Sequence, residues 1–282
     1  MAIIEVAAIL KDYRIDSIGG IIAGLEIFNL AIIPSLLNNA ETWTEMNKEA
    51  EVKLEKLQNL MFRNLFGVPE STPKPLLRFD LGSLSVSEKI HIKKMNFLYH
   101  LKTLDSKSLA SEFYELQVKL NFSGLVVECR RLLNLYGLPN IIDEKVNFSK
   151  ECWKKLVKKA VMAKSEETIK KEMIEYSKLR QIGTSSESLE LKDYIKKMSL
   201  RNARMNFAIR SFMTDCKMNR KSDKAYAEKL WKCDYCKNLD SQSHILWCPA
   251  FSPLREGKSL SNDQDLVEYF KNVMKIRENQ LI

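Results

Sequence analysis

Residues 233 to 248 read CDYCKNLDSQSHILWC and contain three of the chain's six cysteines and one of its three histidines. Four of their side chains follow a Cys-x2-Cys-x7-His-x3-Cys spacing, namely Cys233, Cys236, His244 and Cys248. Two thiolates separated by two residues reach one ion from a tight turn, and a His and a Cys four residues apart share a helix face. The spacing predicts a structural Zn²⁺ site, because four protein ligands leave no open position for hydrolysis.

A segment this short has little hydrophobic core of its own, so the metal is expected to decide whether it folds. The alternative is that four Cys and His residues lie close in sequence by coincidence. No export signal follows Met1, so disulfides are not expected and we place the chain in the cytoplasm or nucleus, not outside the cell. The other cysteines fall on helical patterns and are interpreted as small buried apolar residues: Cys129, Cys152 and Cys216.

Aromatic and aliphatic side chains surround the four ligands: Trp231, Tyr235, Ile245 and Trp247. Exposed aromatic residues beside a basic metal-binding segment are suited to stacking on nucleotide bases, and Trp231 and Tyr235 are the candidates. The alternative is that these side chains form a small core around the metal. We favour that alternative for Ile245 and for one of the two tryptophans.

The net charge of the chain is +9, and the excess lies in one stretch. Residues 1–150 contain 18 basic and 18 acidic residues, residues 151–250 contain 22 and 13, and residues 251–282 contain five of each. A basic segment beside a neutral one indicates a polyanionic partner such as RNA or DNA. A solvated Lys/Glu-rich helical surface is the alternative explanation.

Within the basic stretch, Lys197, Arg201 and Arg204 have i, i+4, i+7 spacing and would share one face of a helix expected over residues 188–212. Further cations follow before the cysteine cluster: Arg210, Lys217, Arg220, Lys221 and Lys224. A row of cations that leads into a zinc-binding segment favours contact with a phosphate backbone over a merely solvated helix face.

The chain has 282 residues with only nine glycines and seven prolines, which favours a mainly α fold over a many-stranded one. Apolar periodicity predicts successive helices, including one with a Ser85–Glu88 capping box, one that begins near Ser149, and one over residues 263–276. Residues 13–37 could be helix or buried strand. Glu26 and Pro34 in their most apolar part favour buried core over a membrane span, so no membrane partner is expected.

The sequence shows no Gly-rich phosphate loop, nucleophile elbow, zinc-protease helix or kinase motif. Its acidic residues are dispersed among lysines, whereas two-metal phosphoryl chemistry requires clustered aspartates. Catalysis is therefore not indicated.

Several segments together resemble the C-terminal region of reverse transcriptases from non-LTR, Jockey-type retrotransposons. They are PSLLNNAETW at 34–43, LEKLQN at 54–59, VPESTPKP at 68–75, CDYC at 233–236 and HILWCPAF at 244–251. The resemblance implies a helical thumb and linker followed by a terminal CCHC zinc knuckle, with the polymerase palm and its aspartates missing. It divides the chain into a thumb-like part (1–76), a helical linker (77–225), and the knuckle with a C-terminal helix (226–282).

The resemblance also implies function and partners. It suggests a nucleic-acid-binding fragment with no polymerase activity alone, which would act on RNA or DNA beside the remaining polymerase domains of a retroelement protein. Two alternatives stay open at this point. One is a helical protein-interaction adaptor held together by zinc, and the other is an inert retroelement remnant.

Overall fold

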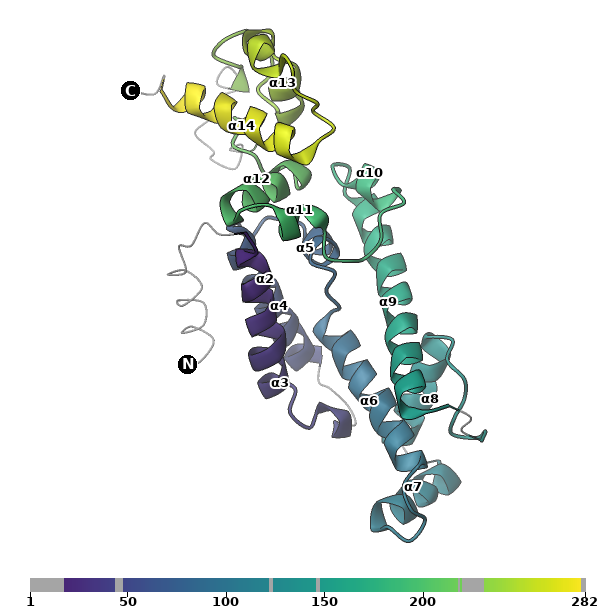
Figure 1. Cartoon of the computed structure of the whole chain (residues 1–282). Helices are drawn as coiled ribbons and strands as arrows, with labels where there is room; N and C mark the ends of the chain where they lie inside the picture. The colour runs from purple at the N-terminus through teal and green to yellow at the C-terminus, as the bar shows by residue number, and fades with distance from the viewer. Residues whose placement is uncertain are drawn as a thin grey trace. The chain divides into compact units, whose positions relative to one another are not determined.

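The computed structural model of the chain describes residues 18–43, 48–121, 124–145, 148–217, 219 and 231–279. These residues are mainly helical and include no β-strand, so the predicted mainly α fold class is confirmed (Figure 1). Antiparallel pairing within the described ranges is limited to isolated bridges, such as Leu81 with Leu191.

The helices form two compact units. Among described residues, unit 1 contains 18–24, 63–73 and most of 192–279, and unit 2 contains most of 25–62 and 74–191. Helices α2 (Gly20–Ile27) and α4 (Lys48–Phe66) contribute residues to both units. The three consecutive segments expected from the sequence stay a prediction, because a grouping into compact units does not test where independent domains begin.

Unit 2 is built around α6 (Val86–Lys102), which packs against η2, α7, α8 and α9 (Figure 1). Its other elements are η1 (Phe28–Ile32), α3 (Ile33–Leu36), η2 (Ala40–Thr42), α5 (Lys74–Asp80), α7 (Leu109–Leu120), α8 (Leu125–Leu135), α9 (Lys150–Glu175) and α10 (Arg180–Gly183). Trp153 of α9 is fully buried, and its indole N–H donates to the Met95 carbonyl at 3.1 Å. This hydrogen bond satisfies the polar group of the largest side chain in the core.

The start of α9 agrees with the expected cap, since the Ser149 hydroxyl accepts from the Cys152 amide. The helix runs unbroken to Glu175. No glycine or proline interrupts this helix, and Val161 and Ser165 continue its buried face through the middle. A short helix, α10, follows after α9.

The ambiguous apolar segment is helical from Gly20 to Leu36, and its earlier part, residues 13–17, lies outside the described residues. A π-helical turn, η1, precedes Pro34, which has no amide proton to donate to the preceding turn. Phe28 is buried, but Leu30 is 77% exposed, so the segment expected to be buried core also has an exposed apolar side chain. Within the described ranges, no helix is both long and apolar enough to cross a membrane.

Unit 1 contains α11 (Asp193–Lys197), α12 (Leu200–Arg210), α13 (Gln242–Trp247), η4 (Pro249–Arg255) and α14 (Asp263–Glu278). The single helix expected over residues 188–212 was therefore wrong. Met198 and Ser199 are extended between α11 and α12, and Ser199 forms an antiparallel bridge with Ile18. Phe207 of α12 stacks on Phe66 at the end of α4 with 3.9 Å between ring centroids.

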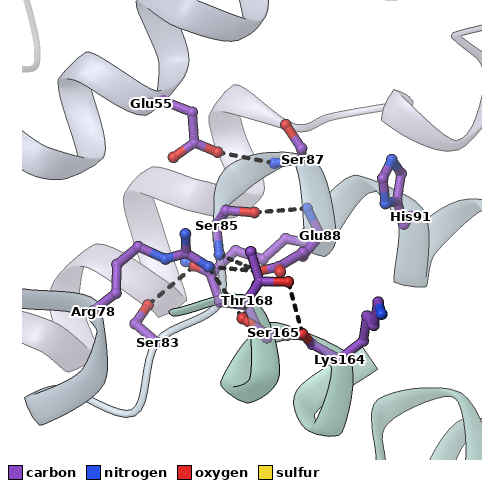
Figure 2. Close-up of polar contacts among 12 residues, drawn as sticks. Glu55, Arg78, Ser83, Ser85, Ser87, Glu88, His91, Lys164, Ser165 and Thr168 are labelled. Carbon is purple, nitrogen blue, oxygen red and sulfur yellow. Dashed lines mark hydrogen bonds and ion pairs between the residues drawn. The ribbon is translucent and has the colours of Figure 1, made fainter. Parts of the chain in front are cut away.

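The predicted Ser85–Glu88 capping box is confirmed and has a second role in unit 2 (Figure 2). Oε2 of Glu88 accepts from the Ser85 amide at 2.7 Å, from the Arg78 guanidinium at 2.8 Å and from the Ser165 hydroxyl at 3.0 Å. Both charged side chains are largely shielded from water. One carboxylate oxygen thus joins α5, the first turn of α6 and α9.

We expect Glu88→Gln to lower the free energy of unfolding by about 1–3 kcal/mol, because it removes one charge of a largely buried pair and leaves Arg78 uncompensated. Urea unfolding followed by circular dichroism measures the change. Glu167→Gln is the matched control, since Glu167 pairs with lysines of its own helix at an exposed position. Equal urea midpoints for the Glu88→Gln variant and the wild type would contradict this role.

His91 gives unit 2 a dependence on pH. Its Nδ1 lies 2.8 Å from the Tyr136 hydroxyl, and burial, with help from nearby Arg131 and Lys94, lowers the pKa of His91 from 6.5 to about 4. Between these two pH values, His91 therefore binds a proton in the unfolded chain but stays neutral in the folded chain. The contribution of His91 to the free energy of unfolding is therefore fully present above pH 6.5. It decreases by roughly 2–3 kcal/mol as the pH falls toward 4.

His91→Asn removes this titration, so its stability should decline less than that of the wild type between pH 7 and pH 4.5. Urea unfolding at several pH values measures the difference. His100→Asn, at an exposed histidine of the same helix, should follow the wild type. Parallel pH profiles for all three proteins would show that His91 is not the group responsible.

Candidate metal centre and adjoining basic surface

The four predicted metal ligands converge in unit 1. One ligand atom from each of Cys233, Cys236, His244 and Cys248 lies within 4.8 Å of every other. The Cys233 and Cys248 sulfurs are 3.9 Å apart, those of Cys248 and Cys236 are 3.7 Å apart, and Nε2 of His244 is 3.1 Å from Cys236 Sγ. A tetrahedral ion with metal–sulfur bonds of 2.3 Å requires sulfur–sulfur edges of about 3.8 Å. The four residues therefore fit one metal ion.

A tight backbone turn places the first two sulfurs. The Cys233 amide donates to the Asn238 carbonyl at 2.6 Å, and the Lys237 amide donates back to the Cys233 carbonyl at 3.0 Å. Lys237 has a φ of 63°, in the left-handed region, which turns the chain directly after Cys236. Lys232 and Leu239 form an antiparallel bridge at the base of the turn.

The helix α13 places the other two ligands. The Ser241 hydroxyl accepts from the His244 amide at 3.0 Å and so caps the helix at the turn that carries the histidine. Cys248 is the C-cap residue, four residues and one turn further along. The Arg255 guanidinium donates to the carbonyls of Leu246 and Cys248, which satisfies acceptors that a helix end leaves open.

The thiols differ in acidity. Burial raises the pKa of the Cys248 thiol to about 11. Burial acts in the same direction at Cys236, but hydrogen bonds, first among them one from the Asn238 backbone, hold the pKa of that thiol below its ordinary value. A bound metal would take the place of the thiol protons, since metal ligands must be deprotonated.

The centre is part of unit 1 and not a separate appendage. Ile245 is fully buried, as expected, and its carbonyl accepts from the Tyr269 hydroxyl of α14 at 2.5 Å. Asp240 is buried and pairs with Arg277 of α14 at 2.5 Å. The Gln242 side chain donates to the Ile209 carbonyl at the end of α12. These contacts hold the ligand-bearing helix against α12 and α14.

The predicted cationic stripe does not lie on a single helix. Lys197 ends α11, where it forms an exposed ion pair with Asp193, and Arg201 and Arg204 belong to α12. Arg201 is exposed. Arg204 is half-buried, and its guanidinium donates to the carbonyls of Leu65 and Asn64 at the end of α4. Desolvation lowers the pKa of Arg204, and its contacts give it a structural role.

The other residues predicted to bind nucleic acid differ from one another in their surroundings. The Arg210 guanidinium lies 5.9 Å from the centre of the Tyr194 ring, and Lys217 pairs with Asp234 at 2.6 Å. Trp231 is half-buried. Arg220 and Lys221, with Lys224, lie outside the described residues.

Tyr235 takes part in the packing around the centre. Its ring meets Phe251 edge to face with 5.0 Å between centroids, and its hydroxyl donates to the Ile276 carbonyl at 3.2 Å. These contacts fit the alternative interpretation, a small core around the metal, and base stacking by Tyr235 stays a prediction.

Sequence analysis missed three candidate binding residues. Trp247, between the last two ligands, is 72% exposed, which makes it more available for stacking than the other aromatic side chains in the described ranges. Lys271 and Lys275 of α14 line a hollow of about 150 Å³ together with Arg201. Lys271 also lines a second hollow, of about 430 Å³, with Lys197. The i, i+4 spacing of the two α14 lysines was visible in the sequence.

We call the surface formed by Lys197, Arg201, Lys271 and Lys275 the basic surface. Its cations come from α11, α12 and α14, and Glu268 and Glu278 lie at its hollows. The Lys271 ammonium also contacts the Asn202 side chain.

No protein-family model, curated protein or solved structure matches this chain.

We expect the wild-type protein purified with Zn²⁺ to retain about one metal equivalent per chain, as one four-coordinate site requires. Cys233→Ser should lose the metal, and α13 should lose its protection from proteolysis, because one of the four donors is gone. Cys152→Ser is the control, since Cys152 is exposed and outside the cluster. Atomic absorption and limited proteolysis measure both effects. A metal-free wild type, or a Cys233→Ser variant with full metal content, would refute the site.

Proposed function

We propose that unit 1 binds single-stranded RNA or DNA on a fold held together by a structural Zn²⁺ ion. The observation that supports this proposal best is the basic surface, where cations from three helices line two hollows that share Lys271. Phosphate backbones are bound by such rows of cations, and each neutralised phosphate adds affinity through counterion release.

Zinc is the metal that the donor set favours. Three thiolates and one imidazole are soft and borderline donors, and hard cations such as Mg²⁺ and Ca²⁺ prefer oxygen. Four protein donors leave no position for a water, so the ion would stabilise the fold and would not activate a nucleophile. Its effect on binding would be indirect, through the position of α13.

The ion pairs of the basic surface do not prevent phosphate binding. Lys197 and Asp193 are both mainly exposed, and such pairs contribute little free energy. A phosphate can therefore replace the aspartate as the partner of Lys197. Glu268 and Glu278 would repel a phosphate placed beside them, so the strand should follow the cations of α12 and the middle of α14.

Trp247 provides the second kind of contact. An exposed indole stacks on any unpaired base, which favours a single strand over a duplex. The same exposed indole favours a second candidate function, a protein-interaction adaptor, because tryptophan is a common anchor at protein interfaces. The two functions differ in whether binding depends on the lysines of α14.

The proposal extends to the origin of the chain. We infer that it derives from the thumb, linker and knuckle region of a non-LTR retrotransposon reverse transcriptase, and that the polymerase domains of such a protein are a further partner. The support is the set of sequence segments that carry the resemblance, together with the Cys-Cys-His-Cys order of the metal ligands.

We expect the double substitution Lys271→Glu and Lys275→Glu to weaken binding of a single-stranded oligonucleotide by tenfold or more at ~100 mM salt. The slope of log affinity against log salt should decrease in magnitude by about 1.4, since each lost phosphate contact contributes about 0.7. Fluorescence anisotropy at several salt concentrations measures both. Lys154→Glu with Lys158→Glu is the control, with the same spacing on exposed positions of α9. Equal losses for both double variants would contradict a defined surface.

Trp247→Ala should cost about 1–3 kcal/mol of binding free energy, the range found for one stacked base, without changing the salt slope. Trp247→Phe should retain most of the affinity because it keeps an aromatic ring. Unchanged oligonucleotide binding by Trp247→Ala, combined with loss of a protein partner, would instead support the adaptor.

A further inference from the structure

An apolar stripe runs along the exposed side of α7 in unit 2. It consists of four residues that are 82%, 59%, 49% and 50% exposed: Leu109, Phe113, Leu116 and Leu120. Their spacing of four, three and four residues is the d-a-d-a pattern of a coiled-coil seam. Isolated exposed apolar residues are common, but four at seam spacing on one short helix form a helix face that the described part of the chain leaves uncovered.

The opposite face of α7 is already occupied. Tyr114 is buried, with the Lys102 ammonium 5.9 Å from the centre of its ring, and Ser111 is buried beside it. The Ser108 hydroxyl caps the helix by accepting from the Ser111 amide. These contacts with unit 2 fix the rotation of α7 and leave the stripe directed outward.

The charges beside the stripe indicate what covers it. With Phe113 and Leu120 at a positions, Glu112 and Lys119 both fall at g, and both are exposed. In an antiparallel pair of helices, g positions face g positions, so a second copy would bring its Lys119 to Glu112 and its Glu112 to Lys119. In a parallel pair, Glu112 would face Gln117, with no charge to match.

We propose that the stripe of α7 is a homodimer interface, in which α7 of a second copy of this chain packs antiparallel on the first. The arrangement has two-fold symmetry, as an isologous interface requires. It buries the four apolar side chains of each copy and pairs Glu112 with Lys119 twice. This inference is independent of nucleic-acid binding, because α7 contains none of the residues proposed for that function.

The test uses the full chain and measures its mass by sedimentation equilibrium over a range of concentrations. The wild type should show a concentration-dependent dimer. Glu112→Lys alone and Lys119→Glu alone should each raise the dimer dissociation constant by about tenfold, because each reverses both symmetry-related pairs. An equimolar mixture of the two variants should form heterodimers, since every pair across the interface is then of opposite charge.

The double variant Glu112→Lys with Lys119→Glu should dimerise like the wild type. Phe113→Ser should abolish dimerisation, and circular dichroism should show that it leaves the helix content unchanged. Glu151→Lys, at an exposed position of α9, should have no effect on the mass. A wild type that stays monomeric at 100 μM, where about micromolar affinity would give a dimer, overturns the proposal. A dimer whose dissociation constant does not change on these charge reversals also overturns it. So does an equimolar mixture of the two single variants that fails to form heterodimers.

Discussion

Unit 1 depends on the convergence of three cysteine sulfurs and one imidazole nitrogen on a single point. Thiols held this close repel one another once they ionise, and α13, which has only six residues, is too short to be stable alone. A cation at the centre would resolve both problems, because it would compensate the thiolates and hold His244 and Cys248 one helical turn apart. The carbonyls of Ile245 and Cys248 then lie where Tyr269 and Arg255 can donate to them, which connects α13 with α14 and η4.

Local features of this fold were predictable from the sequence, whereas the position at which a helix is interrupted was not. The capping box of Ser85 and Glu88 and the metal ligands depend on residues a few positions apart, so their spacing is visible in the sequence. The interruption between α11 and α12 has no glycine or proline to mark it. At the interruption, Ser199 forms a bridge with Ile18, which lies 181 positions earlier.

The basic surface was predicted in part, for a similar reason. Charge counted along the chain identified Lys197 and Arg201, but α14 begins with two aspartates and therefore appeared neutral. Its lysines lie beyond the acidic first turn, so a helix with four acidic and three basic residues still has one basic side. Arg204 fitted the predicted stripe equally well, yet its partners are carbonyls of α4, 139 and 140 positions away in sequence. No pattern within one helix predicts such a contact.

The first turn of a helix is usually where unfolding begins, because its amides have no partners within the helix. In unit 2 the carboxylate of Glu88 changes this for α6. The oxygen that accepts from the Ser85 amide also accepts from side chains of α5 and α9. That end of α6 cannot fray while the neighbouring helices stay in place, so it opens only when they separate. Hydrogen exchange at the Ser85 amide would therefore follow the cooperative unfolding of the unit, as exchange in a buried strand does, although the residue stands at a helix terminus.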